Sequence, residues 1–98
     1  MAEFILLMHD DIAQGASESD WAPYLAMLGE RDVLRGGSAI GDGAAFRRDG
    51  ADANVTAHLT GFIRIEARDL DEARGLLVGN PVYEAGGTVE VRALPRTD

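Results

Sequence analysis

The stretch LTGFIRIEARDLDEA, residues 59–73, holds the change from strand to helix that decides the fold. Successive side chains of a β-strand point to opposite faces. The small and apolar set, which we expect to face a core, is Gly61, Ile63, Ile65 and Ala67. The mixed set on the other face is Phe62, Arg64 and Glu66. Directly afterwards, Asp69 as an N-cap and Glu72 three residues on form an acid-based variant of the capping box. The stretch therefore predicts an amphipathic strand followed at once by a helix.

One strand and one helix are expected at the N-terminal end of the chain. EFILLMH (3–9) is a short apolar run that suits a buried central strand. After a predicted loop, IAQGASES (12–19), a helix should begin near Ser19 or Asp20, where a short polar side chain can accept free backbone N–H groups. Gly29 is its expected end. Its apolar stripe consists of Trp21, Tyr24, Leu25 and Leu28.

The remaining segments complete an alternating order of strands and helices. VLRGGSAIG (33–41) is typical of a short strand, and residues 44–58 mix a possible strand fragment with an Asp-Gly turn and a polar loop. The second helix should end around Gly79, Asn80 and Pro81, and TVEVRAL (88–94) alternates as a last strand. We therefore predict one α+β domain over residues 1–98, a ferredoxin-like βαββαβ fold with a four-stranded antiparallel sheet. Both helices should cover one face of that sheet.

The face of the sheet opposite the helices is predicted to be mixed in character. On the last strand, Glu90 and Arg92 alternate with Val89 and Val91, as the charges do in 59–73. Such a face is too apolar to be simply solvated and too charged for a dry core, unless the charges are paired. Two sheets packed through it would form a homodimer that encloses a half-polar cleft. The alternative is that the charges face water or form structural ion pairs, for example Arg64 with Glu66 or Glu90.

The composition excludes several classes of partner and compartment. All nine basic residues are arginine, against seventeen Asp plus Glu, and the net charge of −8 disfavours nucleic acid and anionic membranes. The longest apolar run, FILLM, is too short to span a bilayer. Without cysteine there is no disulfide, thiolate nucleophile or Cys-based metal site. The first basic residue is Arg31, so the positive region of a signal peptide is missing, and we expect a cytoplasmic protein.

Several segments together carry a family resemblance. The start EFILLMH, the helix SDWAPYLAML, the segment LRGGSAI, the run LTGFIRIEARDLDEARGLL and the ending GGTVEVRAL resemble the YCII-related proteins, in particular the branch known for its DGPF motif. The resemblance covers nearly the whole chain. It implies a ferredoxin-like domain that dimerises sheet to sheet as a dimeric α+β barrel, with a ligand cleft in each half.

The chain departs from this family at the residues linked to catalysis. Where DGPF relatives have VTDGPF, this chain has VTAHLTGF, and His58 stands in the place of the signature. In YCII relatives with proposed enzymatic activity, a His on the first helix and an Asp after the second strand form a dyad. The resemblance matches these two positions to Tyr24 and Asp42.

Other residues can be assigned chemistry from their type and position. Histidine is the natural proton-transfer group near neutral pH, and the chain has two, His9 and His58. Arg64 could hold a substrate carboxylate or phenolate as a two-pronged donor, beside Glu66. Tyr24 could donate a proton at the mouth of the cleft, or it could pack in the core with its hydroxyl satisfied.

The sequence supports neither a metal nor an organic cofactor. His9, Asp10 and Asp11 offer nitrogen and oxygen ligands, but neighbouring strand residues point to opposite faces and do not converge easily on one ion. GGSAIGDG lacks both GxGxxG and P-loop spacing. We therefore expect no metal and no cofactor.

Two functions follow from these observations. The first is cofactor-free acid/base catalysis, an elimination or isomerisation of a small organic molecule, with His58 or His9 as base, Asp42 as orienting acid and Arg64 as anion holder. The second is a non-catalytic dimeric module that binds a ligand or supports a partner protein. A monooxygenase of the wider dimeric barrel superfamily is a third hypothesis, which rests on architecture alone.

Overall fold

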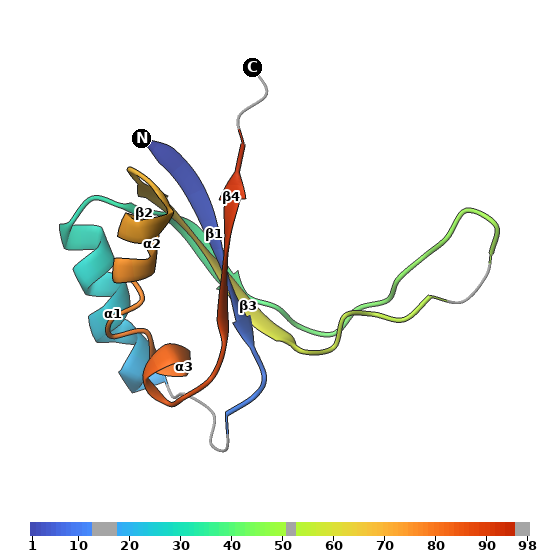
Figure 1. The fold of residues 1–98 in the computed structure, drawn as a ribbon. Helices are drawn as coiled ribbons and strands as arrows, with labels where there is room; N and C mark the ends of the chain where they lie inside the picture. Colours follow the sequence, from blue (N-terminus) through green and yellow to red (C-terminus); the bar gives the residue numbers. More distant parts are fainter. Residues whose placement is uncertain (13–17, 51–52, 96–98) are drawn as a thin grey trace.

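In the computed structural model, four strands form one antiparallel sheet, and the helices cover one of its faces (Figure 1). The structure describes residues 1–12, 18–50 and 53–95. In chain order the elements are β1 (Ala2–His9), α1 (Glu18–Glu30), β2 (Leu34–Ala39), β3 (Leu59–Ala67), α2 (Leu70–Gly75), α3 (Pro81–Glu84) and β4 (Val89–Leu94). The sheet order β2-β3-β1-β4 confirms the predicted ferredoxin-like fold.

The faces of the sheet follow the alternation of the sequence. β1 lies in the middle and pairs antiparallel with β3 and β4. Its side chains alternate between buried and half-buried, and in β3 every second residue from Gly61 to Ala67 is buried, with half-buried or exposed residues between them. The buried side chains of these two strands, which form the core with the helices, are Phe4, Leu6, Met8, Ile63, Ile65 and Ala67. The face assignment of 59–73 is thereby confirmed.

Helix α1 starts at Glu18, close to the predicted Ser19, but Gly29 is not the residue that ends it. The chain leaves the helix through Asp32, which has a left-handed φ of 57°. The backbone N–H of Asp32 donates to Gly29 O over 3.0 Å, and that of Val33 donates to Leu28 O over 3.1 Å. This pair of bonds is a Schellman motif. The predicted loop 12–19 lies mostly outside the described residues.

Helix α2 begins as predicted and ends earlier than predicted. The carboxylate of Asp69 accepts the backbone N–H of Glu72 over 2.9 Å. The Glu72 side chain reaches back one residue further than a capping box requires, to the N–H of Arg68. The helix ends at Gly75, so Leu76 lies in the turn that follows and is still buried.

A short third helix, α3, was not predicted. The sequence predicts that the second helix ends around Gly79, Asn80 and Pro81, but Asn80 is the N-cap of α3 and Pro81 its first residue. The buried Asn80 Oδ1 accepts the backbone N–H groups of Val82 and Tyr83 at 3.0 and 3.1 Å. Asn-Pro is a favourable helix start, because proline has no N–H to leave unpaired.

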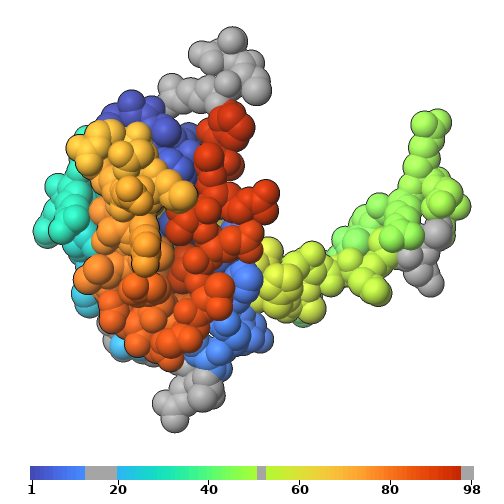
Figure 2. All heavy atoms as spheres, in the orientation of Figure 1, coloured from blue at the N-terminus to red at the C-terminus, as the bar shows by residue number. Residues whose placement is uncertain are grey.

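The segment between β2 and β3 forms a long arm, comprising residues 40–50 and 53–58. It leaves the body on the side of the sheet away from the helices (Figures 1 and 2). A single bridge between Ala45 and Ala53 joins its two halves, and Gly50 closes its turn with a φ of 79°. The radius of gyration is 14.9 Å, against about 12.6 Å for a compact domain of this length.

None of the helices in the described part of the chain has the length and apolar character needed to cross a membrane.

Candidate functional site

A cavity lies where β1 and β2 end and β3 begins, beside the first half of α1. Its volume is about 660 Å³, within the usual range for small-molecule sites. Trp21 and Leu25 of α1 line it together with Val82 of α3. His9 and Asp10 contribute from the end of β1, and segments 36–39 and 60–63 complete the lining. The lining is mainly apolar, with two titratable side chains.

The cavity exists because this end of the sheet carries small residues. Gly37 pairs with Ile63, and Ala39 pairs with Gly61. Three of these four residues have at most a methyl side chain, so little fills the space beside Trp21. The glycines also have a local role, since a Cβ on Gly37 would come within 2.7 Å of a backbone oxygen. The small residues at this end of the sheet therefore explain both the close pairing of β2 with β3 and the open space beside α1.

His9 is held at this cavity by a residue of β4 and by the residue that precedes β3. Its Nε2 lies 3.1 Å from Oε1 of Glu90 on β4. The ring of His58 packs edge to face against the His9 ring, with 4.8 Å between centroids. The backbone N–H of Asp10 donates to His58 O over 2.7 Å and fixes the strand ends together. The structure thus brings together both predicted histidines, 49 residues apart in the chain, and adds a carboxylate to them.

The contacts of Glu90 favour the ionised form of its carboxyl group. The hydrogen bond from His9 and the bond of 3.2 Å from Nη1 of Arg92 hold the pKa of its carboxyl below the usual value. A carboxylate in contact with an imidazole fixes the orientation of the ring. His9 and Glu90 therefore form a histidine–carboxylate pair, an arrangement that can orient a proton-transfer group.

Asp11 secures the start of β4 next to this pair. The Thr88 hydroxyl donates to Asp11 Oδ2 over 2.6 Å, and the Thr88 backbone N–H donates to Oδ1 over 2.9 Å. These two bonds lower the pKa of the Asp11 carboxyl. Because Thr88 precedes β4 directly, the contact helps to set where Glu90 lies.

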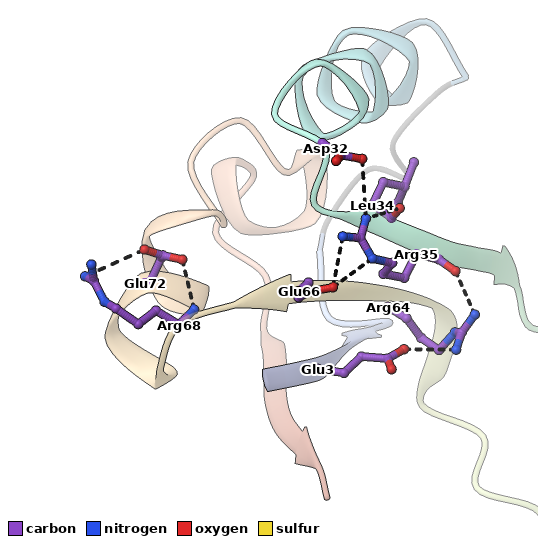
Figure 3. A network of polar contacts seen from close by, with 8 residues as sticks. All are labelled: Glu3, Asp32, Leu34, Arg35, Arg64, Glu66, Arg68 and Glu72. Atoms are coloured by element: carbon purple, nitrogen blue, oxygen red, sulfur yellow. Dashed lines mark hydrogen bonds and ion pairs between the residues drawn. The ribbon is translucent and has the colours of Figure 1, made fainter. Parts of the chain in front are cut away.

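Arg64 and Glu66 lie on the open face of the sheet and do not line the cavity (Figure 3). Arg64 donates through Nη1 to Glu3 over 2.9 Å and through Nη2 to the backbone oxygen of Arg35 over 2.6 Å. Glu66 accepts from Arg35 at 2.9 to 3.0 Å. The prediction of structural ion pairs is met, although the partners are Glu3 and Arg35 and not Glu66 or Glu90. Both donor groups of the Arg64 fork are in use, so neither residue is placed to hold a ligand in the cavity.

Tyr24 packs in the core. The residue is 2% exposed, and its hydroxyl donates to Leu76 O over 2.7 Å. Burial raises the pKa of the phenol, and the neighbouring side chain of Asn80 opposes this effect. Of the two roles considered for Tyr24, core packing is therefore the one that the structure shows.

Asp42 lies in the arm, beyond the end of β2, and is exposed. None of the polar contacts found among the described residues joins it to either histidine. The dyad positions matched by resemblance, Tyr24 and Asp42, are thus not brought together at the cavity. The described residues also include no group of three His, Cys, Asp or Glu side chains that could hold a metal ion.

Glu90 and the aromatic wall of the cavity were missed as site residues. Glu90 had been considered only as an ion-pair partner of Arg64. The sequence does contain the information that places Glu90 near His9, because the predicted fold puts the first and last strands side by side and antiparallel. The end of EFILLMH must then meet the beginning of TVEVRAL, which puts His9 near Glu90. Trp21 and Leu25 could not be assigned, since a helix stripe alone does not show which part of it stays uncovered.

Comparison with known proteins agrees with this fold. The family of YCII-related domains matches residues 4–96. The chain belongs to the YCII-related domain family. Its assignment to the DGPF branch stays a prediction. Among solved structures, this YCII-related chain is similar to the 5-chloro-2-hydroxyhydroquinone dehydrochlorinase of Burkholderia phenoliruptrix AC1100, determined in complex with 2,5-dihydroxybenzoquinone. The TM-score is 0.59 at 18% identity, over 97% of this chain and 95% of that one. No curated protein matches the chain.

Proposed function

We propose that this YCII-related protein binds a small planar organic molecule in the cavity and performs cofactor-free acid/base chemistry on it, with His9 as the base. The observation that carries the proposal is that His9 both lines the cavity and is held by Glu90 at 3.1 Å. His9 replaces the histidine that relatives are expected to carry on the first helix, and Glu90 replaces the acid matched to Asp42.

The lining of the cavity selects the class of ligand. Trp21 and Leu25 offer flat apolar surface, and no arginine is among the described lining residues. A phosphorylated molecule would find no arginine there to hold its phosphate group as a two-pronged donor. An aromatic or quinone-like ring with one acidic C–H or O–H group fits both the apolar wall and the single base.

The proton step uses the two ring nitrogens of His9 differently. Since Nε2 contacts Glu90, we assign Nδ1 to the ligand. A ligand C–H or O–H bond breaks, its electron pair stays on the ligand, and Nδ1 gains the proton. The Glu90 carboxylate stabilises the imidazolium that forms. In an isomerisation the proton returns to another ligand atom. In an elimination a leaving group departs with its bonding electrons, and the imidazolium later releases the proton to solvent.

The solved neighbour supplies a suitable probe. It was determined with 2,5-dihydroxybenzoquinone, a planar ring with exchangeable C–H positions. We expect this compound to bind the wild-type protein in a calorimetric titration. In D₂O, the protein should accelerate the exchange of its ring hydrogens for deuterium, as followed by NMR.

Variants separate binding from proton transfer. His9→Gln should slow the catalysed exchange by about a hundredfold or more, because a positioned base contributes on that scale. It should change binding much less. Glu90→Gln should give a smaller loss, and Asp42→Asn should leave the exchange unchanged, because Asp42 lies in the arm. If His9→Gln exchanges as fast as wild type, His9 is not the base.

A non-catalytic ligand-binding module is the second candidate. The specific observation in its favour is that Tyr24, which occupies the expected histidine position on the first helix, is buried and bonded to Leu76 O. Binding of the probe without any acceleration of exchange would support this alternative and contradict the catalytic one.

We also propose that the protein is a homodimer that associates through the open face of the sheet. Half-buried apolar side chains run across the middle of this face, and the charges around them are paired. The apolar members are Ile5, Leu7, Phe62 and Leu94. Such a face can be covered without leaving unpaired charges behind. Light scattering at micromolar concentration should give twice the mass of the 10.5 kDa chain.

We also propose a cytoplasmic location for the protein, which cell fractionation would test.

A further inference from the structure

We propose that the arm, residues 40–50 and 53–58, clasps the second copy of the chain and buries Phe46 against it. This inference rests on the sheet-to-sheet homodimer proposed above. It adds a contact that the sheets alone do not make.

The arm exposes apolar side chains that its own chain leaves uncovered. Phe46 is 88% exposed, Val55 44% and Ile40 39%. The described part of the arm has only a single bridge, Ala45 to Ala53, between its halves. Hairpins this isolated are marginally stable in water. An extended arm with an exposed aromatic ring near its tip is therefore a feature that a partner would stabilise.

The direction of the arm identifies where that partner must lie. The arm leaves on the side of the sheet opposite the helices, and it stands clear of the body in the space-filling view (Figures 1 and 2). The open face and the arm thus form two walls of one concave surface. A molecule that covers the open face also meets the arm.

The length of the arm fits a second copy. At about 3.3 Å per residue, the six steps from Ile40 to Phe46 span about 20 Å when extended. Two sheets packed face to face lie about 10 Å apart. The arm is therefore long enough for its tip to pass the edge of the partner's sheet.

Charge at the tip favours the same partner. Arg47 and Arg48 stand next to Phe46, in a chain whose net charge is −8. Two adjacent positive charges at the end of an arm are attracted to an acidic surface, and another copy of this chain provides one. The following experiment distinguishes this contact from two alternatives. In one, the arm folds back on the open face of its own chain; in the other, it binds an unrelated protein.

The experiment uses the absence of cysteine, which allows a spin label at one chosen position. Phe46→Cys carrying a nitroxide is mixed in equal amounts with ¹⁵N-labelled wild-type protein. We expect amides of the labelled wild-type copy to broaden, because the tip of the arm contacts it. Val78→Cys is the matched control, since Val78 is 66% exposed and lies between α2 and α3. This control should broaden few amides of the partner.

Affinity provides the second readout. Phe46→Ser should raise the dissociation constant of the dimer about tenfold or more in sedimentation equilibrium, whereas Val78→Ser should not change it. Both side chains are exposed in the single chain, so neither change should prevent folding. A monomeric wild type would overturn the proposed dimer. A dimeric wild type with no broadening from position 46 and an unchanged Phe46→Ser affinity would overturn the clasp alone.

Discussion

At the scale of single residues, position on a strand end decides which polar groups meet. His9 ends β1, His58 precedes β3 and Glu90 lies in β4. Antiparallel pairing brings all three residues to the same end of the sheet. Arg64 sits in the middle of β3 and meets Glu3 of the adjacent strand instead. Charged and histidine side chains therefore form a His9–Glu90 pair at the end of the strands and ion pairs further along the sheet.

Asp11 gives a prediction for pH dependence. Its pKa is lower than the ordinary 3.8 because Thr88 donates two hydrogen bonds to the ionised carboxyl. A lowered folded-state pKa means that the stabilisation is fully present above about pH 4 and is lost as the pH falls through the folded value. In an NMR titration of the carboxyl carbons, Thr88→Val should move the midpoint of Asp11 upwards towards 3.8. An unchanged midpoint would show that the Thr88 hydroxyl does not set this pKa.

At the scale of elements, the strand faces and helix starts could be predicted because they depend on local patterns. The period of two in 59–67 gave the buried set, and Asp69 marked the start of α2. Helix ends were harder, since glycine in the sequence marks a stop only when the chain actually turns there. Gly29 stays inside α1, and the turn comes at Asp32. The ion-pair partners of Arg64 required the register between strands, which a single strand cannot supply.

Asp32 gives a prediction for stability. With a φ of 57°, it occupies the position after a helix where glycine is preferred. Asp32→Gly should therefore raise the free energy of unfolding by roughly 0.5 kcal/mol, because the left-handed conformation strains a residue with a Cβ. Asp32→Ala is the matched control, since it also removes the weak contact of 3.8 Å with Arg35 but keeps the Cβ. Urea denaturation measures both. A less stable Asp32→Gly would mean that the ion pair outweighs the strain.

At the scale of the whole molecule, the ferredoxin-like order could be read from the sequence, but the cavity and the arm could not. The cavity depends on which part of α1 remains uncovered beside Gly37, Ala39 and Gly61, a tertiary property. The arm begins in polar and glycine-bearing sequence that is also typical of a loop folded on the surface. The exposure of Phe46 depends on the path of the arm away from the sheet, which the sequence does not specify.

The most direct measurement is a crystal structure of the protein soaked with 2,5-dihydroxybenzoquinone. We expect density in the cavity beside Trp21, with a ligand atom within about 2.6 to 3.2 Å of His9 Nδ1 and with Glu90 still bonded to Nε2. An empty cavity at a saturating concentration, or a ligand bound there out of reach of His9, would contradict the assignment of His9 as the base of this site.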